Sequence, residues 1–122
     1  MKTEGITWHA ATLDADALDG MKSLLSKTFG LSPAMEFEGV SVFMFPNGSS
    51  LELYAPEAVP DYGYNGDVAF GFRVEDVEAA SAEVQAAGCQ LLGEITRVPE
   101  MGYAYRHFVG PDGRVYGLNE QK

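Results

Sequence analysis

VAFGFRVEDVEAASAEVQAAG, residues 68–88, reads as a strand that leads directly into a helix. Its first seven residues are rich in Val and Phe, which favours a strand. Asp76 stands at the junction between the strand and the helix that follows, and Gly88 can end this helix. Between them, one apolar stripe recurs at helical spacing: Val77, Ala80, Val84 and Ala87. The stretch therefore predicts one strand and one helix that packs against it.

The same order of elements occurs earlier in the chain. ITWHAATL, residues 6–13, is a strand candidate that carries one histidine, His9. DADALDGMKSLLSKTFG follows it, with an apolar stripe at helical spacing: Leu18, Met21 and Leu25. Asp16 and Asp76 stand at corresponding strand-to-helix junctions, 60 residues apart, so that His9 corresponds to Ala69. The chain therefore contains an internal repeat.

Each half continues into a hairpin. In the first half VSVFMF and SSLELY flank the turn PNGS, and in the second half YAYRHFV and RVYGLN flank GPDG. CQLLGEITRV precedes the second hairpin as a further strand candidate. PEAVPDYGYNG, residues 56–66, is dense in Pro, Gly and Asn and is expected to be a linker.

Each half thus reads as β-α-β-β-β. We expect an α+β fold in which two tandem modules form a curved mixed sheet around a cavity, with the helices outside. The 122 residues are expected to form a single domain. Module one spans about residues 5–56, the linker about 56–66 and module two about 67–120.

The composition excludes several classes of function. The net charge is −10 and the eight Lys and Arg residues form no cluster, which argues against a nucleic-acid partner. No apolar run approaches the ~20 residues that span a bilayer. Cys89 is the only cysteine, and acidic residues interrupt the N-terminal stretch where a secretory signal would be apolar. We therefore expect a cytoplasmic protein without membrane contact.

Strand alternation predicts which side chains face the cavity. Leu51 and Leu53 belong against the first helix, and Ile6 and Trp8 belong on the outer face of their strand. The residues that then face inward are Thr7, His9 and Ala11; Ser50, Glu52 and Tyr54; and Ala69, Gly71 and Arg73.

The hairpin turns extend this assignment. With two-residue turns, Glu52 lies opposite Phe43, and Gly117 lies opposite Arg106. The additional inward residues are then Phe43, Phe45, Arg106, Phe108, Val115, Gly117 and Asn119, while His107 points away. A guanidinium at Arg106 would be placed to pair with the carboxylate of Glu52.

With these motifs the chain resembles the vicinal oxygen chelate superfamily, which includes glyoxalases, extradiol dioxygenases and bleomycin-resistance proteins. The resembling stretches are ITWHAATLDAD, SSLELYAP, FGFRVEDVEAA and GPDGRVYGLNE, which together cover both halves. The resemblance implies paired β-α-β-β-β modules, usually in a homodimer, around a cavity for a small molecule.

In metal-dependent members of this family, four inward positions hold the ion, two from each module. The resemblance assigns His9 and Glu52 to the positions of module one, whereas Ala69 and Gly117 stand at those of module two. A catalytic divalent ion takes about three protein ligands. We therefore expect no tight metal site, and a divalent metal (Zn, Ni, Mn or Fe) held by His9 and Glu52 is the alternative.

Three functions stay open. The first is a glyoxalase/bleomycin-resistance-like protein that binds a small aromatic or cationic molecule without a tight metal. The second is a metal-dependent lyase, isomerase or dioxygenase that uses His9 and Glu52 as metal ligands. The third is a metal-free enzyme in which Glu52 or His9 is the general base. The expected ligand-binding residues are Thr7, His9, Phe43, Phe45, Ser50, Glu52, Tyr54, Ala69, Gly71, Arg73, Arg106, Phe108, Val115 and Gly117.

Overall fold

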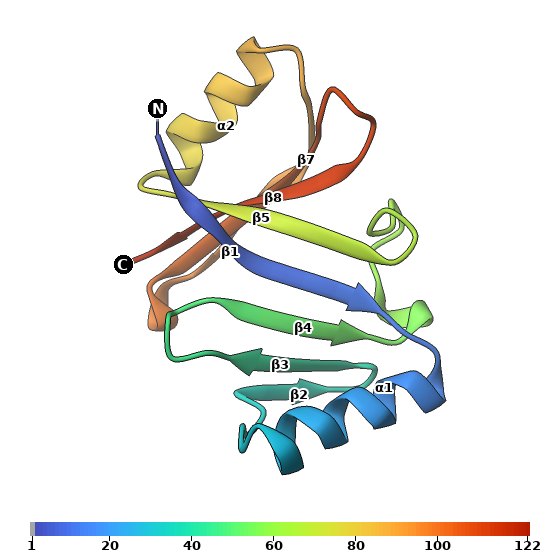
Figure 1. Ribbon diagram of the computed structural model, residues 1–122. Helices are drawn as coiled ribbons and strands as arrows, with labels where there is room; N and C mark the ends of the chain where they lie inside the picture. Colours follow the sequence, from blue (N-terminus) through green and yellow to red (C-terminus); the bar gives the residue numbers. More distant parts are fainter. Residues whose placement is uncertain (1) are drawn as a thin grey trace. The chain divides into compact units, whose positions relative to one another are not determined.

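The computed structural model describes residues 2–122 and has the predicted α+β composition (Figure 1). The strands in this range are β1 (Thr3–Thr12), β2 (Met35–Phe37), β3 (Val40–Met44), β4 (Ser50–Tyr54), β5 (Val68–Val74), β6 (Gln90–Val98), β7 (Tyr103–Val109) and β8 (Val115–Gln121). The helices are α1 (Ala15–Ser23), continued by the π-helical turn η1 (Leu24–Thr28), and α2 (Val77–Ala86), with two short 3₁₀ helices, η2 (Pro56–Ala58) and η3 (Pro99–Met101).

The residues group into two compact units. Unit 1 contains the chain up to Trp8 together with Phe70–Lys122, and unit 2 contains His9–Ala69. Strands β1 and β5 contribute residues to both units, because each boundary falls inside a strand. The module limits and the single domain expected from the sequence stay predictions.

Unit 2 has the strand order β2-β3-β4-β1, and α1 runs alongside the hairpin strands (Figure 1). Its core joins Leu25 of η1 to Phe43 and Leu53, with further apolar residues around them: Leu18, Met21, Leu31, Phe45 and Leu51. Asp14 caps α1, since its carboxylate accepts a hydrogen bond from Ala17 N at 2.9 Å. The predicted helical stripe is confirmed.

Unit 1 has the order β1-β5-β8-β7-β6, in which β5 and β8 pair in parallel and β6, β7 and β8 pair antiparallel. Helix α2 packs on β6, β7 and β8. The core between them contains Val74, Val77, Ala80, Ala104, Phe108 and Leu118. Besides the cap by Asp76, the buried Glu120 carboxylate accepts a hydrogen bond from Val77 N at 2.8 Å, which ties β8 to the start of α2.

Both hairpin turns contain one residue more than the sequence predicted. In the first, Gly48 N donates to Phe45 O and Phe45 N donates to Ser49 O, so that Pro46-Asn47-Gly48 forms a three-residue loop. The second has the same pattern around Pro111-Asp112-Gly113. The glycine that ends each loop has a left-handed backbone, with φ of 87° at Gly48 and 78° at Gly113.

The longer loops shift both predicted registers by one residue. Glu52 pairs with Val42 and Ser50 with Met44, whereas Phe43 pairs with Leu51. The expectation that Phe43 and Phe45 line a cavity is therefore wrong: both belong to the core of unit 2, where Phe43 is fully buried.

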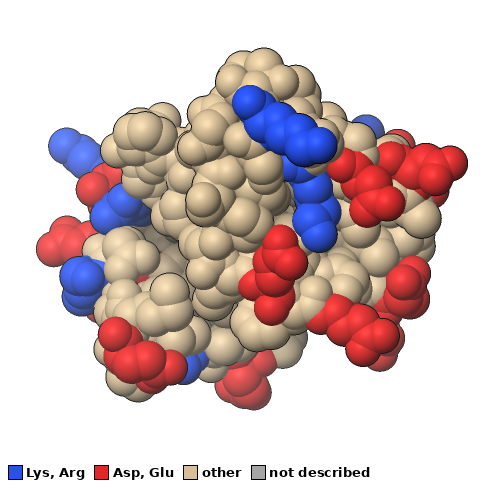
Figure 2. Space-filling model, turned by 90° about the horizontal axis from the view of Figure 1, so that it is seen from below, with Lys and Arg blue, Asp and Glu red and all other residues tan. Residues whose placement is uncertain are grey.

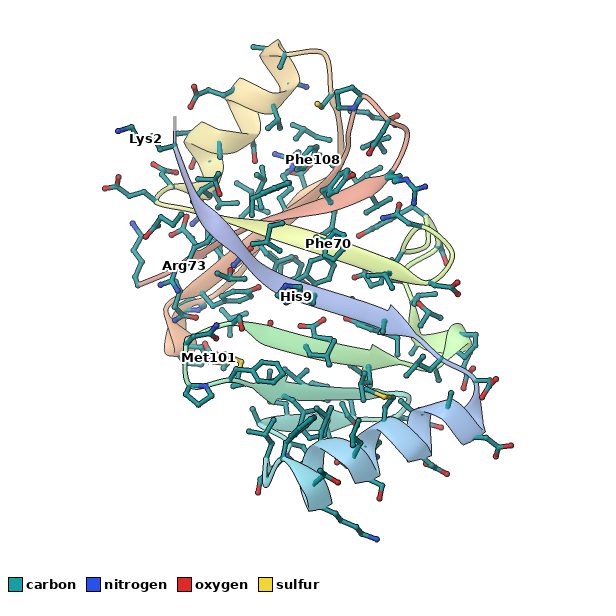
Figure 3. All side chains as sticks on the ribbon, in the orientation of Figure 1. Lys2, His9, Phe70, Arg73, Met101 and Phe108 are labelled. Carbon is teal, nitrogen blue, oxygen red and sulfur yellow. The ribbon has the colours of Figure 1, made fainter. Side chains whose placement is uncertain are left out.

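The same error affects the second hairpin. Gly117 pairs with His107, and Arg106 pairs with Leu118. Arg106 Nε donates to Gly93 O at 3.0 Å, so that the proposed Arg106 partner for Glu52 is wrong. Phe108 also lies on the helix side, in the core beneath α2, and not on the face of Gly117 (Figure 3).

Candidate functional site

His9 lies at the start of the β1 segment that belongs to unit 2, beside β4 (Figure 3). Its Nδ1 is 2.9 Å from the backbone oxygen of Ser50. Because a carbonyl oxygen only accepts, Nδ1 carries a proton, and in the neutral ring Nε2 then has the lone pair. The backbone of β4 therefore orients this imidazole and selects its tautomer.

Glu52 and Tyr54 lie on the same face of β4, opposite the core residue Leu53. The Tyr54 hydroxyl donates a hydrogen bond of 2.7 Å to Glu52 Oε1. Partial burial raises the pKa of the Tyr54 phenol far above its usual value, and the Glu52 carboxylate and the Tyr64 phenol raise it further. Tyr54 is thus a neutral donor that holds the carboxylate in place.

Two further tyrosines join this group from the predicted linker. Tyr64 is almost fully buried and meets Tyr54 edge to face, with ring centroids 5.3 Å apart. Tyr62, which is more exposed, meets Tyr64 at 6.4 Å. The sequence analysis missed both residues, although the pattern Tyr-Gly-Tyr-Asn in a Pro- and Gly-rich stretch was a signal for them. The predicted linker therefore contributes two aromatic rings to the tyrosine cluster that contains Tyr54.

In unit 1, the face that carries Gly71 and Gly117 is filled by Trp8. The two glycines pair with each other across β5 and β8. A Cβ atom added to Gly71 would lie 2.9 Å from Trp8 Cε3, and one added to Gly117 would lie 3.1 Å from the same atom. Trp8 was expected on the outer face of its strand, away from the two glycines. This expectation is wrong: the indole lies against Gly71 and Gly117, whose absent side chains make room for it.

His107 forms the next layer of this packing. Its ring stacks on the indole of Trp8 with centroids 5.2 Å apart and an angle of 27° between the planes. Burial lowers the pKa of His107 to about 4, so the ring is neutral at pH 7. The prediction that His107 points away from Gly117 is wrong for the reason given above, the one-residue shift of the hairpin.

The other residues predicted to bind a ligand lie as follows. Arg73 pairs with Asn119 on the row next to Gly71 and Gly117, and its Nη2 is 3.4 Å from Gln121 O. Thr7 accepts a hydrogen bond of 2.9 Å from Asn119 Nδ2. The remaining two, Ala69 and Val115, are buried. Contact of these residues with a ligand stays a prediction.

A catalytic divalent metal does not fit the donors that unit 1 supplies. Gly117 has no side chain, and the space above it contains the indole of Trp8. Within residues 2–122, no group of three or more His, Cys, Asp and Glu side chains is arranged to hold a metal ion. Since such an ion takes about three protein ligands, His9 and Glu52 need donors from elsewhere.

The sequence contains 18 Asp and Glu residues and eight Lys and Arg residues, which gives a net charge of −10. Figure 2 shows one face of the protein, on which Asp and Glu side chains are exposed at several places together with Lys and Arg side chains. Among the described residues, no helix is long and apolar enough to cross a membrane.

Residues 9–115 match the profile of the Glyoxalase/Bleomycin resistance protein/Dioxygenase superfamily. The chain belongs to this superfamily. The match begins at His9 and extends through both halves of the repeat, so that the resemblance inferred from the sequence motifs is confirmed. No curated protein matches the chain in sequence.

Solved structures with the same fold include a Mn(II)-bound glyoxalase from Novosphingobium aromaticivorans, at a TM-score of 0.73 and 18% identity. That similarity covers 98% of this chain and 39% of the glyoxalase chain. Methylmalonyl-CoA epimerase from Mycobacterium tuberculosis is similar at a TM-score of 0.69 and 16% identity, over 98% of this chain and 89% of that one.

A third similar structure is Streptomyces coelicolor methylmalonyl-CoA epimerase in complex with 2-nitronate-propionyl-CoA. Its TM-score is 0.65 and its identity 20%, over 98% of this chain and 99% of that one. At such identities the three structures show a common fold and leave the ligand of this superfamily member undetermined.

Proposed function

We propose that this superfamily member binds a small aromatic or cationic molecule on the face of unit 2 that carries His9, Glu52 and Tyr54. The observation that carries the proposal is the hydrogen bond of 2.7 Å from Tyr54 to Glu52, backed by the edge-to-face contact of Tyr64. A carboxylate held beside aromatic rings is suited to a planar cation, which gains both charge attraction and cation–π contact.

The charge of the whole protein supports the same ligand class. A net charge of −10 attracts cations in the encounter step. His9 adds a polar group whose orientation Ser50 determines. A mostly apolar surface with a few oriented polar groups is typical of small-molecule sites.

Three probes of matched shape test the proposal: benzamidine is cationic, benzamide neutral and benzoate anionic. We expect benzamidine to bind most tightly by calorimetry, and Glu52→Gln to weaken it by about tenfold, as for a lost charge-assisted contact. Glu57→Gln, which removes an exposed carboxylate of the same unit, is the matched control. Equal binding of benzoate and benzamidine, or an effect of Glu57→Gln as large as that of Glu52→Gln, contradicts the proposal.

The tautomer of His9 favours a second candidate, an enzyme without a tight metal. With Nδ1–H on Ser50 O, Nε2 has the lone pair that a general base uses. The lyase, isomerase or dioxygenase with His9 and Glu52 as metal ligands is the metal-dependent form of the same alternative. Metal analysis after incubation with Mn, Ni, Zn or Fe separates them: stoichiometric metal that His9→Ala abolishes would replace our proposal by the metal-dependent enzyme.

We also propose that the protein is a cytoplasmic homodimer. Cys89 as the only cysteine suits a reducing compartment. Phe29 and Phe37 are 63% and 65% exposed on unit 2, and large exposed apolar residues are often covered in an assembly. Light scattering coupled to size exclusion measures the mass, and a monomer at micromolar concentration contradicts the dimer.

A further inference from the structure

The indole of Trp8 occupies a defined slot in unit 1. The floor of the slot is the glycine pair Gly71 and Gly117, which approaches Trp8 Cε3, and one wall is the imidazole of His107. Trp8 itself is 5% exposed. The slot therefore has the width of one planar ring, with backbone below it and a stacked ring beside it.

One polar atom of the slot has no hydrogen-bond partner within residues 2–122. Asn119 is 6% exposed, and its Nδ2 donates to Thr7. Its Oδ1 borders the space over Gly71, at 3.1 Å from the position of an added Cβ, and finds no donor among the described residues. A buried carbonyl without a donor is unfavourable, so that the indole is an imperfect occupant of the slot.

We propose that this slot is a second binding site, whose ligand is a planar aromatic compound with one hydroxyl or amino donor, and that the ligand binds by displacing Trp8. The ring of the ligand replaces the indole on the two glycines and on His107. Its donor satisfies Asn119 Oδ1, which Trp8 does not. This site is in unit 1, whereas the carboxylate proposed to bind cations is in unit 2.

Trp8 competes with the ligand, because it is part of the same chain. A tethered side chain has a high effective concentration at its own site. The apparent affinity of a ligand equals its intrinsic affinity multiplied by the fraction of protein in which the slot is open. The native protein should therefore bind the ligand at least tenfold more weakly than a variant without the indole.

The first experiment uses Trp8→Ala with phenol and toluene, which differ in the hydroxyl donor. Phenol is expected to raise the midpoint of thermal unfolding of Trp8→Ala in a saturable way, and to raise it more than toluene does. Adding Asn119→Leu to this variant should remove the difference between phenol and toluene. Met101→Ala, which removes an exposed apolar side chain of unit 1, is the control that should gain no phenol binding. Failure of phenol to stabilise Trp8→Ala, or equal effects of phenol and toluene, overturns the proposal.

The second experiment needs no variant. Trp8 is the only tryptophan, so its emission reports the slot directly. Phenol should shift the emission of the native protein to longer wavelength and increase quenching by acrylamide, in a saturable way. An emission that stays unchanged up to the concentration at which phenol unfolds the protein overturns the displacement of Trp8. This measurement remains decisive if Trp8→Ala does not fold.

Discussion

Glu52 on β4 of unit 2 and Gly117 on β8 of unit 1 stand in the last strands of the two halves, yet their surroundings differ. Glu52 keeps a carboxylate that Tyr54 holds by a hydrogen bond, and His9 on the neighbouring strand β1 is oriented by Ser50. Gly117 lies under the indole of Trp8. Since Trp8 and His9 are neighbours on β1, one strand supplies an aromatic filling to one unit and a polar group to the other. The two halves therefore have corresponding strands, but the side chains on these strands differ in chemistry.

The largest expected effect comes from emptying the slot of unit 1. Trp8→Ala should lower the free energy of unfolding by about 3–5 kcal/mol, because it removes a buried aromatic ring and leaves a cavity. Urea unfolding followed by circular dichroism measures this loss. Trp8→Phe should retain part of the stability. A loss below about 1 kcal/mol for Trp8→Ala would show that the indole does not pack as described.

The buried histidine makes unit 1 sensitive to acid. The pKa of His107 is lowered by burial to about 4, so the unfolded chain binds a proton below pH 6.5 that the folded protein does not. The free energy of unfolding therefore has its full value above pH 6.5 and falls between pH 6.5 and 4. The loss is up to about 3 kcal/mol, since each unit of pKa shift corresponds to about 1.36 kcal/mol. His107→Phe should remove this part of the pH dependence. If the free energy of unfolding of the variant falls as steeply between pH 6.5 and 4 as that of the native protein, the prediction is contradicted.

A methyl group at the floor of the slot tests the packing from the other side. Gly71→Ala places Cβ 2.9 Å from Trp8 Cε3 and should cost about 1–3 kcal/mol by overpacking. In the Trp8→Ala background the same change should cost much less, which a double-mutant cycle measures. Gly20→Ala is the control, since an added Cβ there meets no atom within 4 Å. Additive effects of Gly71→Ala and Trp8→Ala would show that position 71 does not interact with the indole, which contradicts the packing described.

The smallest effect is expected at the polar group of unit 2. Tyr54→Phe removes the hydrogen bond to Glu52 and should cost about 1–2 kcal/mol at pH 7. Because the pKa of Tyr54 is raised, the folded protein keeps a proton that the unfolded chain loses above pH 10, and stability falls as pH rises past that value. Unfolding at pH 8 and pH 11 compares the variant with the native protein. The native protein should lose more stability than Tyr54→Phe over this interval.

The sequence predicts much of the fold, because local signals specify it. The helical stripes, the β-rich runs and the two Pro-Asx-Gly turns each depend on residues close together in the chain. The alternation of Leu51 and Leu53 also predicts correctly that these residues pack in the core. The same alternation leaves Glu52 and Tyr54 together on the other face of β4.

The errors in the two hairpins come from one physical source. Side chains alternate along a strand with a period of two, so one additional residue in a turn transfers a whole set of side chains to the opposite face. Pro46-Asn47-Gly48 and Pro111-Asp112-Gly113 form three-residue loops, which two-residue turn rules miss. Phe43 and Phe108 thereby enter the cores, and His107 takes the place expected of Arg106.

By itself, the sequence determined the order of the elements and the internal repeat, since short-range propensities and spacings carry them. Its motifs also match the superfamily profile over residues 9–115. Only the tertiary structure decided the register of the hairpins, the tautomer of His9 and the seat of Trp8 over Gly71 and Gly117. Each of these depends on contacts between residues far apart in the chain. Tertiary packing decides which side chain fills the space above a glycine, and no local sequence pattern predicts that side chain.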